Sequence, residues 1–161
     1  MPNQVSDVNN LLDSLYLELL DLIEQHTECR INIERINNAG QLLLAKTRYN
    51  QGSNSISTAQ IPTENSEDFK ALCNVEKELD IENTIAGEKK HLIRHKVEKS
   101  QGYVEPLHWF AALPPTTLRN ATEYFKKSVE LVVQGANIQT ELLAVMDKIE
   151  RLKQIKKQLV L

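Results

Sequence analysis

The sequence is poor in the residues on which small disulfide-rich proteins and β-sandwiches depend. Its 161 residues include two cysteines, five glycines and five prolines, and aromatic residues make up 5%. Two cysteines cannot build a disulfide framework, and we expect both to be reduced thiols of an intracellular chain. The scarcity of aromatics and helix breakers, beside many Leu, Lys, Glu and Gln residues, favours long helices over sheets.

Long hydrophobic runs are also missing. No apolar run approaches the roughly twenty residues that a helix needs to cross a bilayer, so we expect no membrane span. The first ten residues, MPNQVSDVNN, lack a basic region followed by an apolar core, so we predict no secretory signal. A net charge of -3 and 25% charged residues are typical of one ordinary soluble domain.

Apolar residues at alternating spacings of four and three predict a long helix over residues 5–49. The spacing is that of a heptad seam, the stripe by which one helix packs along another. Its positions are Val5, Val8, Leu12, Leu15, Leu19, Leu22, His26, Cys29, Ile33, Ile36, Gly40 and Leu43. Further leucines at Leu11, Leu20, Leu42 and Leu44 widen the stripe, which indicates more than one neighbour.

Three positions weaken this seam. His26 and Cys29 lie one helical turn apart and have two interpretations, a pair of metal ligands or a polar register marker beside a small buried thiol. A zinc site needs three or four ligands, and no other Cys or His is near in the sequence, which favours the second interpretation. Glycine costs about 1 kcal/mol against alanine inside a helix, so Gly40 predicts close approach of another backbone or a local kink.

The middle of the chain, residues 51–105, is predicted to be a loosely ordered polar and basic linker. Residues 51–67 are rich in Ser, Asn, Thr and Gln. Over residues 68–82, Phe69, Leu72, Val75 and Leu79 fall at helical spacing and predict a short amphipathic helix. A basic cluster follows, made of Lys89, Lys90, His91, Arg94, His95, Lys96 and Lys99.

The basic cluster has three interpretations. It could contact anionic lipid headgroups, bind nucleic acid, or be a solvated part of the linker. No aromatic residue is interleaved and the net charge is negative, so we predict no nucleic-acid binding and favour the solvated linker. His91 and His95 are four residues apart, but Leu92 follows His91, so the HExxH metalloprotease motif is absent and we predict no metal site.

A second long helix is predicted from about Leu118 to the last residue. Pro114 and Pro115 disfavour helix before them, and Thr117 is a candidate N-cap. The spacing of four and three recurs at Ile138, Leu142, Val145, Ile149, Leu152 and Leu159, interrupted only by Lys156. Upstream, Phe125, Val129, Val132 and Ala136 form a stripe that drifts relative to that seam.

These patterns predict an all-α protein in which two long helices form an antiparallel coiled-coil hairpin, joined by a long loosely ordered linker. The segments are residues 1–50, 51–105 and 106–161, and the two helices match in length at about 60–65 Å. The same seams could also form a homodimer. The sequence has no glycine-rich phosphate loop, no nucleophile elbow and no grouped acid and base, so we predict no enzyme, no catalytic residues and no cofactor.

Two motifs lie where the linker meets the helices. The helix-end motif, LAKTRYNQG, covers residues 44–52, and the entry segment, PLHWFAALPPTTLR, covers residues 106–119. LDSL at residues 12–15 adds a weaker signal. At the following positions the chain resembles the coiled-coil domain-containing protein 115 family, small accessory factors for assembling the vacuolar-type proton-pumping ATPase (V-ATPase): Leu44, Ala45, Lys46, Arg48, Tyr49, Gly52, Pro106, Leu107, Trp109, Phe110, Pro115, Leu118, Arg119, Ala121 and Phe125.

The resemblance implies a non-catalytic chaperone at the cytoplasmic face of the endoplasmic reticulum membrane. Such a protein forms a complex with a membrane-embedded assembly factor and transiently holds the V-ATPase membrane sector, so its association with the membrane is peripheral and runs through partners. Endosomes, lysosomes and early secretory vesicles are further implied locations, and lysosomal acidification is the process served. The alternative function is a structural coiled-coil adaptor or vesicle tether unrelated to the proton pump.

The resemblance also implies a set of partner-binding residues in the two motifs and just after the second one. They are Lys46, Arg48, Tyr49, Trp109, Phe110, Pro115, Leu118, Arg119 and Phe125. Buried aromatic and Arg side chains dominate interface energetics, which makes Trp109 and Phe110 candidate anchors for a partner. The two rings could equally serve the hairpin itself as a hydrophobic plug that closes the helical pair.

Overall fold

A computed structural model describes residues 2–52, 54–71, 73–79, 90–96 and 105–160. In chain order the elements are helix α1 (Pro2–Gln51), 3-10 helix η1 (Thr58–Gln60), strands β1 (Cys73–Leu79) and β2 (Lys90–Lys96), 3-10 helix η3 (Pro106–Trp109) and helix α2 (Thr116–Val160). Packing divides the chain into two units. Unit 1 comprises Met1–Ile31 and Gln134–Leu161, and unit 2 comprises Asn32–Val133.

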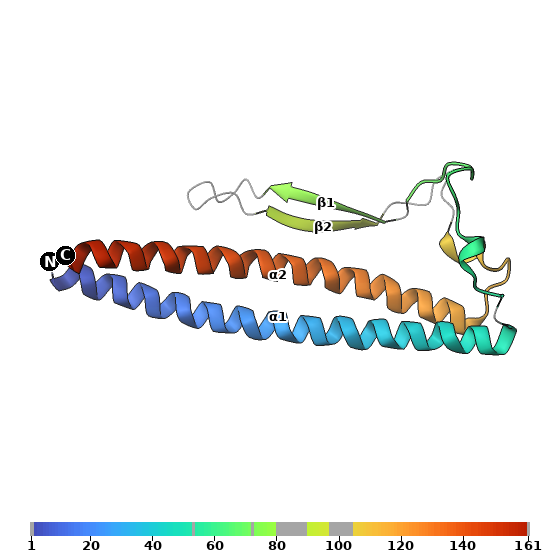
Figure 1. Cartoon of the computed structure of the whole chain (residues 1–161), viewed down its shortest axis with the longest axis horizontal. Helices are drawn as coiled ribbons and strands as arrows, with labels where there is room; N and C mark the ends of the chain where they lie inside the picture. Colours follow the sequence, from blue (N-terminus) through green and yellow to red (C-terminus); the bar gives the residue numbers. More distant parts are fainter. Residues whose placement is uncertain (1, 53, 72, 80–89, 97–104, 161) are drawn as a thin grey trace. The chain divides into compact units, whose positions relative to one another are not determined.

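The predicted fold class is confirmed, because two long helices, α1 and α2, dominate the chain and pack against each other. The early part of α1 and the late part of α2 form unit 1, and the late part of α1 and the early part of α2 belong to unit 2, so the helices are antiparallel in each (Figure 1). In the described parts of the chain, neither helix contains an apolar stretch long enough to cross a bilayer.

The core of unit 1 follows the predicted seam. Its buried residues are Leu12, Leu15, Leu22 and Cys29 on α1 and Ile138, Val145 and Ile149 on α2. Full burial of a Leu, Ile or Val side chain contributes about 1.5–3 kcal/mol, so these positions supply most of the helix pairing energy. Cys29 is the small buried thiol of the second interpretation: burial raises the pKa of its thiol, and it is not in a disulfide.

The sequence has identifiable signals where α1 ends and where α2 begins. After α1, Gly52 adopts φ +94°, a left-handed conformation that glycine takes without steric cost. Helix α2 begins at Thr116, two residues before the predicted start at about Leu118, so the predicted N-cap Thr117 is wrong because this residue lies inside the helix. The carbonyl of Pro115 accepts the first amide hydrogen bonds, from Leu118 and Arg119, so Pro115 and not Thr117 precedes the first turn.

The linker contains a two-stranded antiparallel sheet that we did not predict. Cys73 lies opposite Lys96 and Leu79 lies opposite Lys90 in its register. The predicted short helix over residues 68–82 is therefore wrong across β1. The segment CNVEKEL also places Cys73, Val75 and Leu79 at alternate positions, a spacing that suits a strand, and β2 supplies the backbone partners. Of the predicted basic cluster, five residues lie in β2, whereas Lys89 and Lys99 lie outside the described residues.

Candidate functional site

The helix-end motif and the entry segment meet in unit 2 through a hydrogen-bonded pair of threonines. The hydroxyls of Thr47 and Thr117 are hydrogen-bonded at 2.7 Å, and the Thr47 hydroxyl also lies 2.8 Å from the Leu43 carbonyl. Thr47 is fully buried. Because a buried hydroxyl without a partner costs about 1–3 kcal/mol, this pair fixes the end of α1 against the first turn of α2.

About two helical turns before Thr47, Gly40 makes room for an aromatic ring. A Cβ atom placed on Gly40 would lie 3.0 Å from two ring carbons of Phe125. The prediction of close approach was right about the crowding and wrong about its source, which is the Phe125 side chain rather than another backbone. Phe125 therefore packs inside the helical pair, with its ring half-buried.

The chain that follows α1 is held by side chains of both motifs. Arg48 Nε donates to the carbonyl of Ile56 at 3.1 Å, and Ile56 is buried. Ser57 caps η1 in a capping box with Gln60, whose side-chain amide donates to the carbonyl of Phe110 at 3.3 Å. The loop after α1 is thereby connected to the entry segment.

The entry segment folds around an aromatic contact. η3 brings Trp109 against Phe69 of the linker, with ring centroids 5.1 Å apart and planes at 70°, an edge-to-face arrangement. Arg119 Nε donates to the carbonyl of Pro114 at 3.0 Å, and Pro114 is buried. The Trp109 ring therefore packs the linker against the entry segment. This contact within the chain corresponds in part to the hydrophobic plug that is the second interpretation of the ring.

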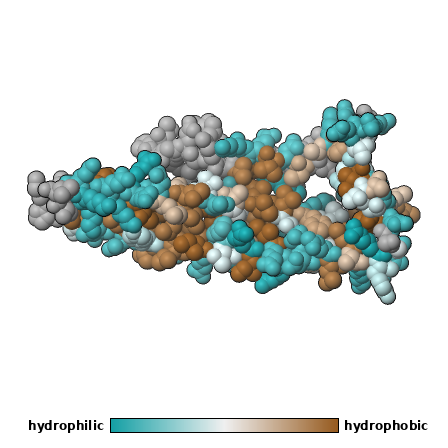
Figure 2. Space-filling view, viewed as in Figure 1, coloured by the Kyte–Doolittle hydropathy of each residue, from teal (hydrophilic) through white to brown (hydrophobic). Residues whose placement is uncertain are grey.

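An apolar cavity of about 780 Å³ lies inside unit 2. Figure 2 shows the surface hollowed between the linker and the helices, with hydrophobic side chains beside the hollow. The apolar lining residues are Leu44, Ile56, Phe69, Ala71, Pro106, Leu107, Phe110, Leu118, Phe125 and Val129. Volume and lining suit a few apolar side chains or a chain segment of comparable size.

Three cations line this cavity, Lys70, Arg94 and Lys126, and each interacts within the chain. Arg94 of β2 binds Glu130 of α2, and its Nε lies 2.9 Å from Cys73 Sγ. The hydrogen bond to Cys73 is the main cause of a raised pKa for the Arg94 guanidinium. Lys126 pairs with Glu123 at 2.9 Å and Glu105 at 3.6 Å, and the Glu123 hydrogen bond chiefly raises its pKa.

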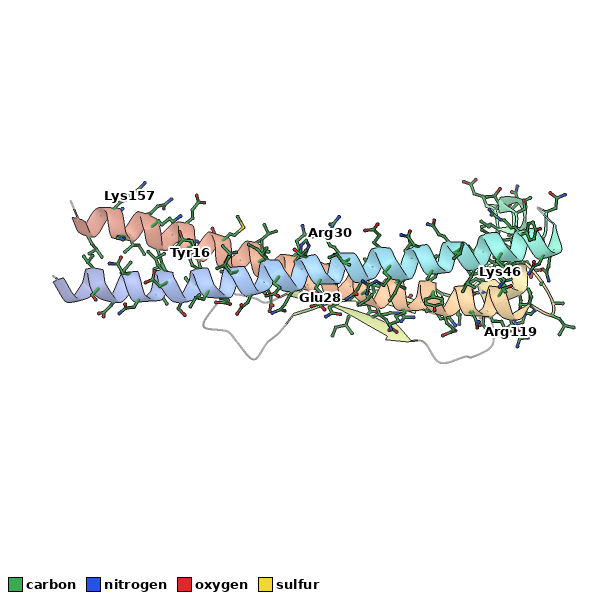
Figure 3. All side chains as sticks on the ribbon, turned by 90° about the horizontal axis from the view of Figure 1, so that it is seen from below. Tyr16, Glu28, Arg30, Lys46, Arg119 and Lys157 are labelled. Carbon is green, nitrogen blue, oxygen red and sulfur yellow. The ribbon has the colours of Figure 1, made fainter. Side chains whose placement is uncertain are left out.

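The most exposed large apolar side chains among the described residues belong to the two motifs. Tyr49, in the helix-end motif, is 90% exposed, and Leu113, in the entry segment, is 87% exposed. Lys46 is also exposed, and Lys46 and Arg119 lie at the same end of the helices of unit 2 (Figure 3). An exposed aromatic and an exposed leucine in the same unit as a wide apolar cavity are features of an interaction surface.

The structure gathers the nine predicted partner-binding residues in unit 2 but in different environments. Phe110, Leu118 and Phe125 line the cavity, whereas Trp109 packs on Phe69. Arg48, Pro115 and Arg119 bind backbone groups inside the chain, and Lys46 and Tyr49 face solvent. Sequence reasoning missed Thr47, Ile56, Phe69, Arg94 and Leu113, although Thr47 continues the seam four residues after Leu43.

Apolar side chains make up most of the cavity lining. The residues that the structure describes contain no group of three or more His, Cys, Asp or Glu side chains able to hold a metal ion. Arg94 and Lys126 at the cavity edge are bound to carboxylates of the same chain. Among the described residues of the two motifs, the groups exposed to a ligand include apolar area, the Tyr49 side chain and the Lys46 side chain.

Comparison with known proteins gives one informative match. No protein-family model matches the chain. The chain is 27% identical over 154 residues to the human vacuolar ATPase assembly protein VMA22, and the match covers 84% of this chain and 86% of the human protein. Along most of its length, the chain is therefore similar to an assembly protein of the vacuolar ATPase.

Proposed function

We propose that the chain is a non-catalytic assembly chaperone for the membrane sector of the V-ATPase. It acts at the cytoplasmic face of the endoplasmic reticulum membrane, in complex with a membrane-embedded assembly factor, and associates with the membrane through that partner. The observation that carries this proposal is the similarity to human VMA22 over most of both chains.

The site in unit 2 gives the proposal a physical basis. An assembly chaperone must hold a subunit and release it again, and moderate apolar contacts serve that purpose better than a large permanent interface. Tyr49 and Leu113 are exposed and free to enter a partner, and the cavity can receive apolar side chains in return. Lys46 lies three residues before Tyr49 and adds one positive charge to the same helix end.

Co-purification tests the proposal. The tagged full chain, expressed in cells that lack their own copy, should recover a membrane-sector subunit and a membrane-embedded assembly factor from detergent extracts. Replacing both Tyr49 and Leu113 with Ser should lower that recovery at least about fivefold, because exposed aromatic and leucine anchors are lost while no core residue changes.

The matched control for this pair is Leu42→Ser, which removes a leucine that is 71% exposed on the same helix. Recovery should change less than about twofold with this variant. If wild-type chain recovers neither membrane-sector subunits nor a membrane-embedded factor, the assembly role is wrong. Recovery of vesicle or cytoskeletal proteins instead would favour the adaptor or tether.

A further inference from the structure

The two sides of the helical pair in unit 1 differ in chemistry. On each helix the seam positions face the other helix, and a neighbouring residue lies about 100° away around the axis. Reversing the direction of one helix also reverses its sense of rotation as seen along the pair. Residues that directly follow seam positions therefore fall on one side of the antiparallel pair, which we call side A. Residues that directly precede seam positions fall on the other side, which we call side B.

A groove of about 950 Å³ in unit 1 agrees with this assignment. Asp13 and Tyr16 of α1 line it together with Lys153 and Lys157 of α2, and all four follow seam positions. The Lys153 ammonium lies 5.4 Å from the centroid of the Tyr16 ring. Seam position 29 lies between Glu28 and Arg30, and Figure 3 shows these two side chains on opposite sides of α1.

Side A continues from this groove as a mainly apolar surface, which Thr27, Gln139 and Glu150 interrupt. Its large apolar side chains are all at least 38% exposed and comprise Tyr16, Leu20, Ile23, Leu143 and Met146. Side B at the same levels is polar except for Ala144, with Ser14, Glu18, Asp21, Gln25 and Glu28 on α1 and Asn137, Glu141, Lys148 and Arg151 on α2. Its exposed large apolar residues, Leu11 and Ile155, lie at one end. A helical pair with one apolar and one polar side is built to receive a further element on the apolar side.

We propose that side A binds an amphipathic α-helix of a partner protein, with acidic residues at the end that meets Lys153 and Lys157. Tyr16, Leu20 and Ile23 are spaced by four and three residues, and Leu143 and Met146 by three. With this spacing, the apolar side chains of another helix can pack between those of side A. From Asp13 to Arg30 side A extends over about 25 Å, the length of a helix of about five turns.

The positive charges at one end of side A indicate that the partner helix carries acidic residues there. Lys153, Lys156 and Lys157 line the groove with a single carboxylate, that of Asp13. Hydrogen bonding to Tyr16 is the main cause that raises the pKa of Lys153, so this ammonium stays charged at neutral pH. Glu or Asp residues on the partner would supply the missing negative charge.

A second copy of this chain fits side A less well. If two copies met with their helices reversed, Arg30 of one would face the lysines of the other. If they met in the same direction, the lysines of both copies would share one end, where each copy has three lysines and only the two carboxylates of Asp13 and Glu150. Both arrangements leave an excess of positive charge, which an acidic partner helix removes.

Binding of a synthetic helix tests the proposal on the full chain. The probe is a fluorescein-labelled peptide of about three heptads, with Leu at the a and d positions and Glu in its last turn. Fluorescence anisotropy should show binding in about the micromolar range. Replacing Leu20 and Leu143 with Gln should weaken binding at least about tenfold, because both side chains are exposed on side A.

The control pair is Leu11→Gln with Ile155→Gln, which removes two similarly exposed side chains from side B. It should leave affinity within about twofold, and circular dichroism should show equal helicity for both pairs. Replacing Lys153 and Lys157 with Glu should weaken the Glu peptide and strengthen a peptide that carries Lys at those positions.

Three results would overturn the proposal. They are no binding of the wild-type chain at about 1 mM peptide, equal losses from the two pairs, and affinity that does not respond to the charge reversal. Sedimentation analysis supplies the remaining test: if the wild-type chain is a dimer that Leu20→Gln with Leu143→Gln separates, a second copy occupies side A. The proposed assembly role is tested with other residues in unit 2, so either proposal can fail alone.

Discussion

The contact between Gly40 and Phe125 predicts that Gly40→Ala destabilises the wild-type chain but stabilises a variant that lacks the Phe125 ring. Gly40→Ala should gain about 1 kcal/mol because alanine is the better helix former. In the wild-type chain the added Cβ would lie 3.0 Å from the Phe125 ring, and overpacking of this kind costs about 1–3 kcal/mol. The free energy of unfolding should therefore fall by about 1 kcal/mol.

Removing the ring removes the crowding. Phe125→Ala alone should destabilise by about 2–3 kcal/mol, less than a fully buried Phe, because the ring is half-buried. Adding Gly40→Ala to this variant should then stabilise it by about 1 kcal/mol. The double-mutant cycle should accordingly show a coupling energy of about 2 kcal/mol between the two positions.

Urea unfolding measures all four members of this cycle. Trp109 is the only tryptophan and lies in unit 2 with both residues, so its fluorescence is the local probe and far-ultraviolet circular dichroism the global one. Ala45→Gly is the control, because Ala45 is exposed on the same helix and should show only the helix-forming cost of about 1 kcal/mol. Equal stabilisation by Gly40→Ala with and without the Phe125 ring would refute the close contact.

Three further predictions concern the same unit. Thr47→Val should destabilise by about 1–3 kcal/mol in urea unfolding because Thr117 loses its partner, whereas adding Thr117→Val should restore part of that loss; no restoration would mean that the two hydroxyls do not bind each other. Phe69→Leu should shift Trp109 fluorescence toward longer wavelength, because the edge-to-face contact that shields the indole is lost, and an unchanged spectrum would contradict that contact. Folding raises the pKa of Lys126, so its carboxylate contacts stabilise the chain below the ordinary lysine pKa of about 10.4 and are lost as pH rises through the folded value; the stability advantage over Lys126→Met in urea unfolding should shrink above about pH 10, and an advantage that grows there would reverse the assigned sign.

The two long helices could be predicted from the sequence because a seam repeats many times along each of them. The short element over residues 68–82 could not, since seven residues such as Cys73–Leu79 fit a helical and an alternating pattern almost equally well. What decides between them is β2, which lies beyond a segment of ten residues and supplies the hydrogen-bond partners. Pairing of that kind leaves no trace in a local window of sequence.

The candidate site was predictable to the extent that its residues are unusual in a helical sequence. The Trp-Phe pair and the double proline identified the entry segment, but nothing in the polar linker indicated that Phe69 packs on Trp109 or that Ile56 is buried. Thr47 was passed over because a threonine between Lys46 and Arg48 looks like part of a polar helix end. Its burial follows from α2, which supplies Thr117 at the required position.

At the junction of the two motifs, some predicted partner-binding residues also hold the fold, and this limits which variants can test partner binding. Arg48 and Arg119 hold backbone carbonyls of Ile56 and Pro114, so replacing either arginine alters the loops as well as any partner contact. Loss of binding in such variants would not distinguish a contact residue from a structural one. Tyr49 and Leu113 expose nearly all of their side chains, so their replacement changes a contact at little cost to the fold. A loss of partner recovery with unchanged urea unfolding in these variants would therefore place the interface at the junction.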